Sequence, residues 1–337
     1  MAKDSNFLGV DIGASSVKIV EIANDNGRAR LVTYGYTEHQ ADISDEDVFS
    51  PEKRGKELAD LCKEAGVSTK RAITGLPMSS VFSTIFTFPE GSEKQLEEMI
   101  RSKAQKLSPI PTEDLVLDWK KMSASPEEKI IKFSVTAASK KMINNYVQIF
   151  KIAGLELLSL ETEALAMVRS LLGKDQAPSI IVDIGAVKTN VLVIKEGVPV
   201  IHRTVKAGGQ DITAVLSSKM KIDLKKAEEV KRNLSLAKLE GVENLLQEVL
   251  EPIVNEVKYC QNLHTEQYNH SQIEKLVLTG GSAHILGMPE VLRQASGLRV
   301  FVGDPWARII YPDDLRPVLD KIGPYFSVAI GLSMRDI

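Results

Sequence analysis

Short apolar runs separated by polar turns open the chain and predict a mixed layer of strands and helix. The alternating and continuous apolar runs of 7–36 predict a three-stranded meander, with a strong hairpin turn at 24–27. Apolar positions recur at helical spacing over 51–66, and Gly66 is expected to cap that helix. A returning strand at 71–76 completes a layer in which strands alternate with a helix.

The pattern changes between residues 80 and 160, where a self-contained set of elements is expected. This stretch has no grouping of His, Asp and Ser, no metal-ligand spacing and no glycine loop beyond Gly91. A segment without candidate chemistry at this place predicts an inserted module that binds a partner. Its expected strands are 81–88, 115–120, 130–137 and 155–160, and its expected helices are 92–107, capped by Ser92, and 139–152, capped by Ser139 and closed by Gly154.

The second half of the chain follows the same plan as the first. A short helix over 161–173 leads into a hairpin and a third strand, after which helices are expected at 223–239 and 242–269. Pro252 lies inside the second of these helices and should start a new turn or kink it. Later expected elements are a strand at 276–279, a helix from about Pro289, and an apolar helix at 326–332 in which Ala329 and Gly331 suit close helix contact at a lobe junction.

One pentapeptide occurs twice. Val-Asp-Ile-Gly-Ala stands at 10–14 and again at 182–186, 172 residues later (183 minus 11). Each copy ends a short apolar run, is followed by small or hydroxyl residues, and leads into a second apolar run. Repetition at this distance predicts two like-folded lobes, each offering one acidic residue and one glycine turn to a shared cleft.

The residues of the repeat suit a phosphate ligand with magnesium. A strand that ends in Asp-x-Gly places a carboxylate at its tip, and the glycine lets backbone N–H groups approach an anion. Mg²⁺ binds through one or two carboxylates together with water and substrate phosphates, so Asp11 and Asp183 are the candidates for such a site. For a single copy an ordinary tight hairpin turn is the commoner interpretation, and only the matched pair favours the shared site.

Two further glycine pairs stand where a nucleotide contact is expected. Gly208 and Gly209 precede a helix that should start near Asp211, where free N–H groups and the helix dipole favour an anion. A loop that needs positive φ is the alternative explanation of this pair. The pair at 280–281 directly follows the strand expected at 276–279, an order that allows close backbone approach to a ligand.

One helix face gathers charge. Glu228, Lys231, Arg232 and Ser235 share a face of the helix expected at 223–239. Such a run of charge is most often the solvated side of a helix. The same set also suits a nucleoside, because the carboxylate can hydrogen-bond a ribose and the guanidinium can stack on a base.

Composition narrows the class of protein. At 337 residues, with 43% hydrophobic and 26% charged residues, the chain suits roughly two globular domains. Its net charge of −3 comes with no basic patch or tail that would favour nucleic acid. No apolar run approaches a membrane span, and 331–337 is too short for an amphipathic anchor. We therefore expect a cytoplasmic protein without direct membrane insertion.

The order of these pieces resembles the superfamily of actin, sugar kinases and heat-shock ATPases. That order is a first phosphate loop, a connecting helix, a second phosphate loop, an adenosine helix, an adenosine glycine loop and a second connecting helix. Within the superfamily, the text at 9–18, the inserted module and the text at 160–166 resemble the PilM family, cytoplasmic type IV pilus assembly proteins related to the cell-division protein FtsA. The resemblance implies a two-lobed, actin-like α/β fold of the duplicated ribonuclease H-like kind, with an inserted α+β subdomain.

The resemblance also implies where the domains lie. The first lobe would comprise 1–79, completed by 161–175 and 322–337, and the inserted module would comprise 80–160. The second lobe would comprise 176–321, with a helical part at about 212–272.

Each matched position takes an implied role. Asp11 and Asp183 would hold Mg²⁺ through water, and both would belong to the catalytic centre with Glu163, which falls where related ATPases place the glutamate that orients the attacking water. The usual proline after that glutamate is replaced by Ala164, and a plain helix-face carboxylate is the alternative. ATP contacts are implied for Gly13, Ser15, Ser16 and Lys18 in the first loop, Gly185, Lys188 and Thr189 in the second, Gly208 and Gly209 in the cleft, Glu228, Lys231 and Arg232 at the ribose and adenine, and Gly280, Gly281 and Ser282 below them.

The family resemblance implies an adaptor that binds ATP and hydrolyses it slowly at most. Its expected partner is the N-terminal cytoplasmic peptide of the inner-membrane protein PilN, held in a groove of which the inserted module forms one wall. Self-association into a ring beneath the pilus machine is also implied. The protein would then be cytoplasmic and peripheral at the inner membrane through its partner.

Other functions remain open at this stage. A small-molecule kinase on the same fold would need a general base near the connecting helix, where only Glu161 and Glu163 are available. An FtsA-like division filament would be expected to carry a C-terminal amphipathic anchor, which we do not expect here. A structural protein without nucleotide is the plainest alternative.

Overall fold

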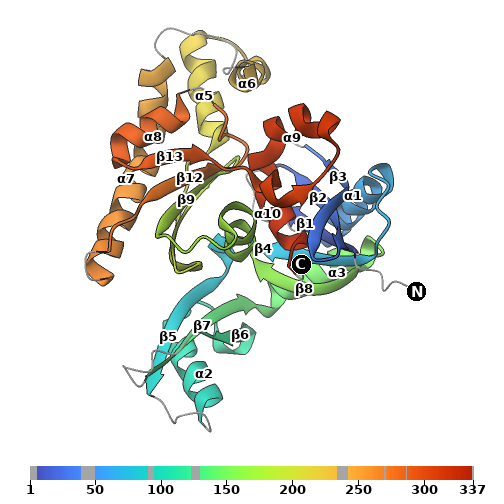
Figure 1. The fold of residues 1–337 in the computed structure, drawn as a ribbon, viewed down its shortest axis with the longest axis vertical. Coiled ribbons are helices and arrows are strands. Elements are labelled where there is room, and N and C mark those ends of the chain that lie inside the picture. Colours follow the sequence, from blue (N-terminus) through green and yellow to red (C-terminus); the bar gives the residue numbers. More distant parts are fainter. Residues whose placement is uncertain are drawn as a thin grey trace.

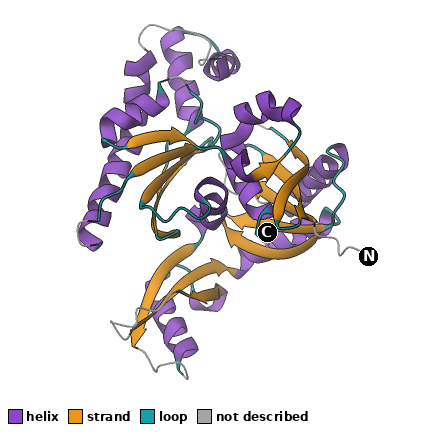
Figure 2. Cartoon of the chain, in the orientation of Figure 1, coloured by secondary structure: helices purple, strands orange, loops and turns teal. Residues whose placement is uncertain are grey.

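The computed structural model describes residues 6–38, 50–89, 95–122, 130–233, 242–268, 271–285 and 287–335. Its strands form three sheets, of six, five and three strands. The two larger sheets lie on either side of helix α10 (Ser327–Ser333), and the three-stranded sheet projects away from them (Figure 1). Helices cover the sheets, as Figure 2 shows by secondary structure.

The six-stranded sheet contains the meander predicted at the start of the chain. Its hairpin turn places Asn26 and Gly27 at φ 54° and 82°, the left-handed conformations that a two-residue hairpin turn needs. In spatial order the sheet contains β14 (Ile309–Ile310), β3 (Arg28–Tyr36), β2 (Val17–Asp25), β1 (Asn6–Ile12), β4 (Arg71–Leu76) and β8 (Glu156–Thr162).

Two helices cover one side of this sheet. In α1 (Pro51–Glu64), Ser50 accepts a hydrogen bond from the Lys53 amide as the N-cap, and Gly66 follows the helix at φ 66°. In α3 (Lys140–Ile152), Ser139 caps the Met142 amide, and Gly154 follows at φ 70°. Both helices, the cap Ser139 and the closing glycines Gly66 and Gly154 were predicted, and these predictions are confirmed, whereas the Ser50 cap was not predicted.

The three-stranded sheet has its own small core. One face of β7 carries Phe133 and Val135, which pack with Phe86 of β5 and Ile100 of α2. The expected cap Ser92 and the neighbouring Gly91 lie outside the described residues. The elements are η2 (Met78–Ser80), β5 (Phe82–Pro89), α2 (Leu96–Leu107), η3 (Thr112–Asp114), β6 (Leu115–Lys121) and β7 (Ile130–Ser139), with the sheet order β5-β7-β6.

The structure narrows the inserted module that the sequence assigned to 80–160. Strand β8 pairs in parallel with β4 of the six-stranded sheet, and α3 packs on α1 in the core of that sheet. An alternating pattern shows that a segment forms a strand but not which sheet it joins. We therefore propose that the module consists of β5, α2, β6 and β7.

The five-stranded sheet follows the plan of the first, again as a meander extended by parallel strands. In spatial order it contains β11 (Val198–Val205), β10 (Thr189–Lys195), β9 (Ser179–Ile184), β12 (Lys275–Thr279) and β13 (Arg299–Val302). Its helices are α5 (Gly209–Met220), α6 (Leu224–Asn233), α7 (Val242–Gln267) and α8 (Met288–Ser296).

Helices α6 and α7 correspond to the two helices predicted in this half. Helix α7 continues through Pro252, so the proline lies inside one helix and does not begin a separate one, and the kink expected there stays a prediction. The helix expected at 223–239 is described to Asn233, and its remainder, including Ser235, lies outside the described residues.

The chain returns to the first sheet earlier than predicted. Strand β14 pairs with β3, and Trp306 and Leu319 are buried with Val20 and Ile22 of the six-stranded sheet. We therefore propose that the second lobe, predicted as 176–321, ends before this segment. The returning elements are η5 (Pro305–Arg308), η6 (Asp313–Leu315), α9 (Arg316–Ile322) and η7 (Gly323–Phe326), which precede α10.

The connection between the lobes starts later than the predicted helix at 161–173. Residues Glu161 and Thr162 still belong to β8, where they pair with Gly75 and Leu76 of β4. The Thr162 side chain then accepts from the Leu165 amide and caps α4 (Glu163–Met167), which continues as the π-helix η4 (Val168–Leu172). Sheet pairing thus holds the first two residues of the expected helix in the strand.

Close helix packing occurs where the small residues predicted it. A Cβ on Gly331 of α10 would overlap the carbonyl of Ala166 in α4. Among the described residues, no helix combines the length and the apolar character that crossing a membrane requires.

Candidate functional site

The two copies of the pentapeptide form matching hairpin turns. In the first, the Gly13 amide donates to the Ser16 carbonyl at 2.9 Å; in the second, the Gly185 amide donates to the Lys188 carbonyl at 3.0 Å. Strand pairs β1–β2 and β9–β10 flank these turns in the same antiparallel arrangement. The predicted duplication of a hairpin is confirmed.

Each turn is preceded by an aspartate with a donor directly across the hairpin. Asp11 faces Lys18 in the ladder, and Lys18 Nζ lies 2.9 Å from Asp11 Oδ2. Asp183 faces Asn190, whose Nδ2 donates to Asp183 Oδ2 at 3.2 Å. The two aspartates therefore occupy equivalent places but have different partners, one charged and one neutral.

Electrostatics place the two aspartates in one neighbourhood. Burial raises the pKa of Asp183, the hydrogen bond from Asn190 opposes that rise, and the charge of Asp11 adds to it. Burial alone would lower the pKa of Lys18, but the charges of Asp11, Tyr325 and Asp183 raise it above its ordinary value. Groups from both hairpins thus act on each other across the gap between the lobes.

Glu163 joins this neighbourhood from the first turn of α4. Its Oε2 accepts a hydrogen bond from the Met78 amide at 3.2 Å. Burial, and then the charge of Asp11, raises the pKa of Glu163 to about 8. The carboxyl is therefore mostly protonated at neutral pH, and it accepts a proton from water only when cations offset the nearby negative charge.

The glycine pair before α5 packs directly on the second turn. The amides of Gly209 and Gln210 donate to the carbonyls of Gly185 and Ala186 at 2.9 and 2.8 Å. A Cβ on Gly208 would lie 2.7 Å from the Gly185 carbonyl oxygen. These two helix-start amides thus have partners within the chain, and a ligand contact at Gly208 and Gly209 stays a prediction.

Helix α5 begins at Gly209, two residues before Asp211, as predicted. The Asp211 carboxylate accepts from the Gly208 amide at 2.8 Å and so acts at the third helical position, inside the helix that starts at Gly209.

The glycine loop after β12 approaches Asp183. Gly280 has φ 90°, and a Cβ there would lie 2.7 Å from Asp183 Oδ1. Ser282 is buried, with its hydroxyl 2.9 Å from the Cβ position of Gly209. The loops at Gly185, at Gly208 and Gly209, and at Gly280 therefore pack against one another beside Asp183. Glycine is required at Gly280, where backbone and carboxylate come this close.

The charged face of α6 turns toward the same loops. Lys231 Nζ contacts the Gly209 carbonyl at 3.0 Å and Glu228 Oε2 at 2.6 Å. Arg232 pairs with Glu228 at 3.1 Å and, through a second nitrogen, with Glu38 after β3 at 3.0 Å. The Arg232–Glu38 pair links α6 to the other lobe, and both of its members are largely exposed.

Several predicted residues differ in how exposed they are. Thr189 is fully buried, and its hydroxyl donates to the Ala207 carbonyl at 2.7 Å, inside the second lobe. Ser16 is buried beside Tyr325, while Gly13 and Ser15 are half-buried at the first turn and Gly281 is exposed. The remaining predicted residues lie on the loops described above.

Three residues that sequence reasoning missed also reach this region. Asn190 follows Lys18 by the same 172 positions that separate the aspartates, so the repeat itself signals it. The ring of Tyr325 lies 4.3 Å from Lys18 Nζ and packs near Gly281. Ser79 accepts a hydrogen bond from Lys188 Nζ at 2.6 Å. Nothing local in the sequence marks Tyr325 or Ser79, because both contacts join distant segments.

The carboxylates fit a metal held through water. The described residues contain no group of three or more His, Cys, Asp or Glu side chains that could hold a metal ion directly. Asp11 and Asp183 nevertheless face one neighbourhood from opposite hairpins. Mg²⁺ commonly keeps several waters and uses one or two carboxylates with substrate phosphates, so this donor set suits it.

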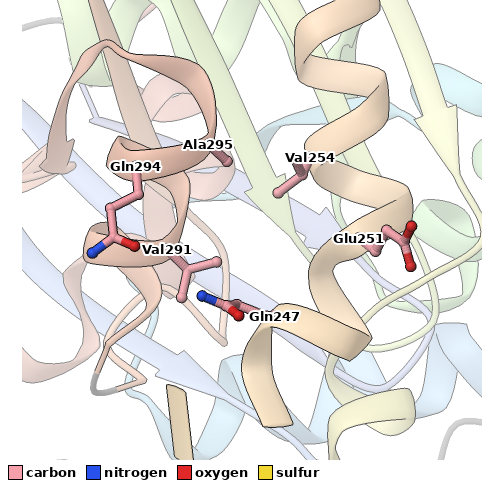
Figure 3. Close-up of a pocket in the computed structure, with 6 residues that line it drawn as sticks. All are labelled: Gln247, Glu251, Val254, Val291, Gln294 and Ala295. Atoms are coloured by element: carbon pink, nitrogen blue, oxygen red, sulfur yellow. The ribbon is translucent and has the colours of Figure 1, made fainter. Parts of the chain in front are cut away.

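Two open cavities lie away from these loops. One of about 270 Å³ lies between α7 and α8 (Figure 3) and is lined by Gln247, Glu251, Val254, Val291, Gln294 and Ala295. Another of about 450 Å³ lies beside β13, where its lining includes Phe301 and Arg308. None of the described residues that line them belongs to the predicted nucleotide site, so we base no function on them.

Comparison with known proteins identifies the family. A family model described as "Type IV pilus assembly protein PilM" matches residues 9–337. The chain belongs to the PilM family. Its resemblance to this family was predicted from the first loop and the insertion, and that prediction is confirmed.

Similar proteins agree with this PilM assignment. The chain is 24% identical over 347 residues to the cell division protein FtsA of Streptococcus pneumoniae serotype 2 (strain D39), covering 89% of this chain and 76% of that protein. A solved "PilM-PilN type IV pilus biogenesis complex" matches with a TM-score of 0.84 and 24% identity, over 97% of both chains. MreB5 of Spiroplasma citri, solved bound to AMPPNP, matches with a TM-score of 0.57 and 13% identity, over 99% of this chain and 96% of that one. The fold is therefore the actin-like ATPase fold, as predicted.

Proposed function

We propose that this chain is an ATP-binding adaptor of type IV pilus assembly that binds the N-terminal cytoplasmic peptide of PilN. The observation that carries the nucleotide part is the pair of equivalent aspartates, Asp11 and Asp183, at facing hairpin turns. The observation that favours the pilus role is the family match over residues 9–337.

The chemistry around the aspartates supports a triphosphate ligand. Lys18 lies across the first hairpin from Asp11 and is buried, and Lys188 lies in the second turn. Buried or half-buried ammonium groups beside glycine turns suit phosphate oxygens, because charge-assisted hydrogen bonds are stronger than neutral ones. The similar MreB5 was solved with AMPPNP, a nucleotide, which is consistent with this proposal.

Magnesium would be held by Asp11 and Asp183 through water. When bound, the ion neutralises phosphate charge and orients the terminal phosphoryl group. The charged face of α6 would hold the nucleoside, with Glu228 at the ribose and Arg232 at the base.

Glu163 would orient the attacking water from α4. Its raised pKa keeps it mostly protonated in the free protein, so we propose slow hydrolysis at most. Catalysis of phosphoryl transfer depends on positioning and charge, and a site can therefore bind ATP well while turning it over slowly.

The partner assignment rests on the similar complex. The chain matches a PilM-PilN complex over 97% of both chains, and PilN is therefore the proposed partner. We propose that the module of β5, α2, β6 and β7 forms one wall of the peptide groove. PilN would then hold the adaptor at the cytoplasmic face of the inner membrane, where copies of the chain would assemble into a ring.

Calorimetry tests the nucleotide site. The wild-type chain should bind ATP in the presence of Mg²⁺, whereas Asp11→Asn and Asp183→Asn should each weaken binding by about tenfold or more through the lost charge. Unchanged affinity in both variants would show that the nucleotide site is placed wrongly. Incubation with ATP and a panel of sugars should give no phosphorylated product, and rapid turnover would favour a kinase instead.

A binding assay with a synthetic N-terminal PilN peptide tests the partner. Fluorescence anisotropy should show saturable binding to the full chain, and a scrambled peptide of the same composition should not compete. Equal binding of both peptides would contradict the proposed partner.

A further inference from the structure

The turn η2 connects the nucleotide region to the inserted module. It follows β4 after a single residue, Pro77, and precedes β5 after a single residue, Val81. Met78 in this turn is buried in a hydrophobic cluster that includes Ala164 of α4 and Leu192 of β10. The entry to the module is therefore packed between the two lobes.

Two polar contacts tie the same turn to the predicted phosphate residues. Lys188 Nζ, beside the second turn, donates to Ser79 Oγ at 2.6 Å. The Met78 amide donates to Glu163 Oε2 at 3.2 Å. Consecutive residues of η2 thus contact one group from the second lobe and one from the connecting helix.

The Lys188 contact is the one that a phosphate would change. Across the described ranges, Lys188 forms no ion pair, and its ammonium group is bonded to a neutral hydroxyl. An ammonium group binds an anionic phosphate oxygen more strongly than a neutral hydroxyl, because the phosphate adds the attraction of an opposite charge. A phosphate at the second turn would therefore compete with Ser79 for this lysine.

We propose that the Lys188–Ser79 hydrogen bond couples the nucleotide cleft to the inserted module, so that ATP releases η2 by taking Lys188. This inference rests on the proposed function, because it requires a phosphate ligand at the second turn. The coupling acts in both directions: a partner that holds η2 in one position changes the affinity for ATP by the same factor. ATP thereby regulates the segment through which the module is attached.

Hydrogen–deuterium exchange of the full chain tests the coupling, with Ser79→Ala as the variant and Ser80→Ala as the matched control. Both serines are exposed in η2. Within the described part of the chain, the side chain of Ser80 forms no hydrogen bond. In the wild type, Mg²⁺ with ATP should speed exchange in η2 and β5 by about threefold to tenfold, the effect of one lost hydrogen bond. AMP, which lacks the outer phosphates, should leave the exchange rate in η2 and β5 unchanged.

Ser79→Ala should show the faster exchange without ATP and no further change when ATP is added, while Ser80→Ala should behave as the wild type. The ATP affinity of Ser79→Ala should equal or exceed that of the wild type, because the hydroxyl that competes for Lys188 is gone. If ATP binds the wild type without changing hydrogen exchange in η2 and β5, or changes it equally in Ser79→Ala, the coupling is overturned but the proposed function is not. Absence of ATP binding to the wild type in calorimetry would overturn the proposed function as well.

Discussion

Lys18 and Asn190 occupy equivalent positions in the two halves of the chain. Each stands directly across a hairpin from an aspartate and donates a hydrogen bond to it, at 2.9 and 3.2 Å. The repeat is therefore conserved in geometry but not in charge, because one half offers an ammonium group and the other an amide. This difference places a positive charge directly across the hairpin from the aspartate in the first half only.

The substitution Lys18→Asn gives the first hairpin the residue type that the second hairpin has at the equivalent position, Asn190. An amide can still donate to Asp11, so the chain should fold, but the buried positive charge is lost. We expect affinity for ATP to fall by about tenfold or more, equivalent to about 1.4 kcal/mol, with a smaller loss for AMP. Calorimetry with both nucleotides measures the difference, and equal losses for ATP and AMP would contradict a phosphate role for Lys18.

Glu163 should make stability depend on pH. Its pKa is about 8 in the folded chain against an ordinary 4.5, so the folded state binds more protons between these values. The contribution is fully present below pH 4.5 and is lost as the pH rises through 8. Between pH 5 and pH 9 the wild type should therefore lose on the order of 4 kcal/mol of unfolding free energy relative to Glu163→Gln.

Denaturant unfolding of both chains at several pH values checks this expectation. Glu64→Gln, at the exposed end of α1, is the control and should follow the wild type. Parallel pH profiles for the wild type and Glu163→Gln would mean that the Glu163 carboxyl is not buried beside Asp11.

The loop after β12 should not tolerate a side chain at Gly280. Alanine there would have to adopt φ 90° and approach Asp183 Oδ1 to 2.7 Å. We expect Gly280→Ala to cost about 1–3 kcal/mol of stability and to weaken ATP binding. Gly297→Ala is the control, since Gly297 also has a positive φ, of 71°, but its Cβ would meet no described atom within 4 Å. Thermal unfolding and calorimetry compare the two, and equal effects would contradict a special role for Gly280.

The contact between α10 and α4 should depend on Gly331. A Cβ at this position would overlap the Ala166 carbonyl, which is backbone and cannot rotate away. Gly331→Ala should therefore cost about 3 kcal/mol or force the helices apart, as overpacking does. Gly35→Ala is the matched control, because its Cβ would meet only side chains, at 3.2 Å. Urea unfolding should separate the two variants clearly, and a mild effect at Gly331 would show that the helices are free to shift.

The sequence by itself determined the local elements and the repeated hairpins. The turns at Asn26–Gly27 and at the two pentapeptides, the caps Ser50 and Ser139, and the glycines after α1 and α3 follow from backbone preferences of single residues. These preferences act within a few residues and can therefore be read without knowing the rest of the chain. The places of Asp11 and Asp183 at strand ends follow for the same reason.

The tertiary structure decided which sheet each strand joins and which distant groups meet. Strand β8 belongs to the six-stranded sheet, and Glu161 remains in a strand because β4 offers pairing partners, not because of its own preference. The contact of Lys188 with Ser79 spans 109 positions and exists only because β10 and η2 are packed against one cluster. Periodicity shows which positions of a segment are buried and which are exposed. Long-range pairing depends on the free energy of the whole packed core, so it cannot be predicted from a short stretch of sequence.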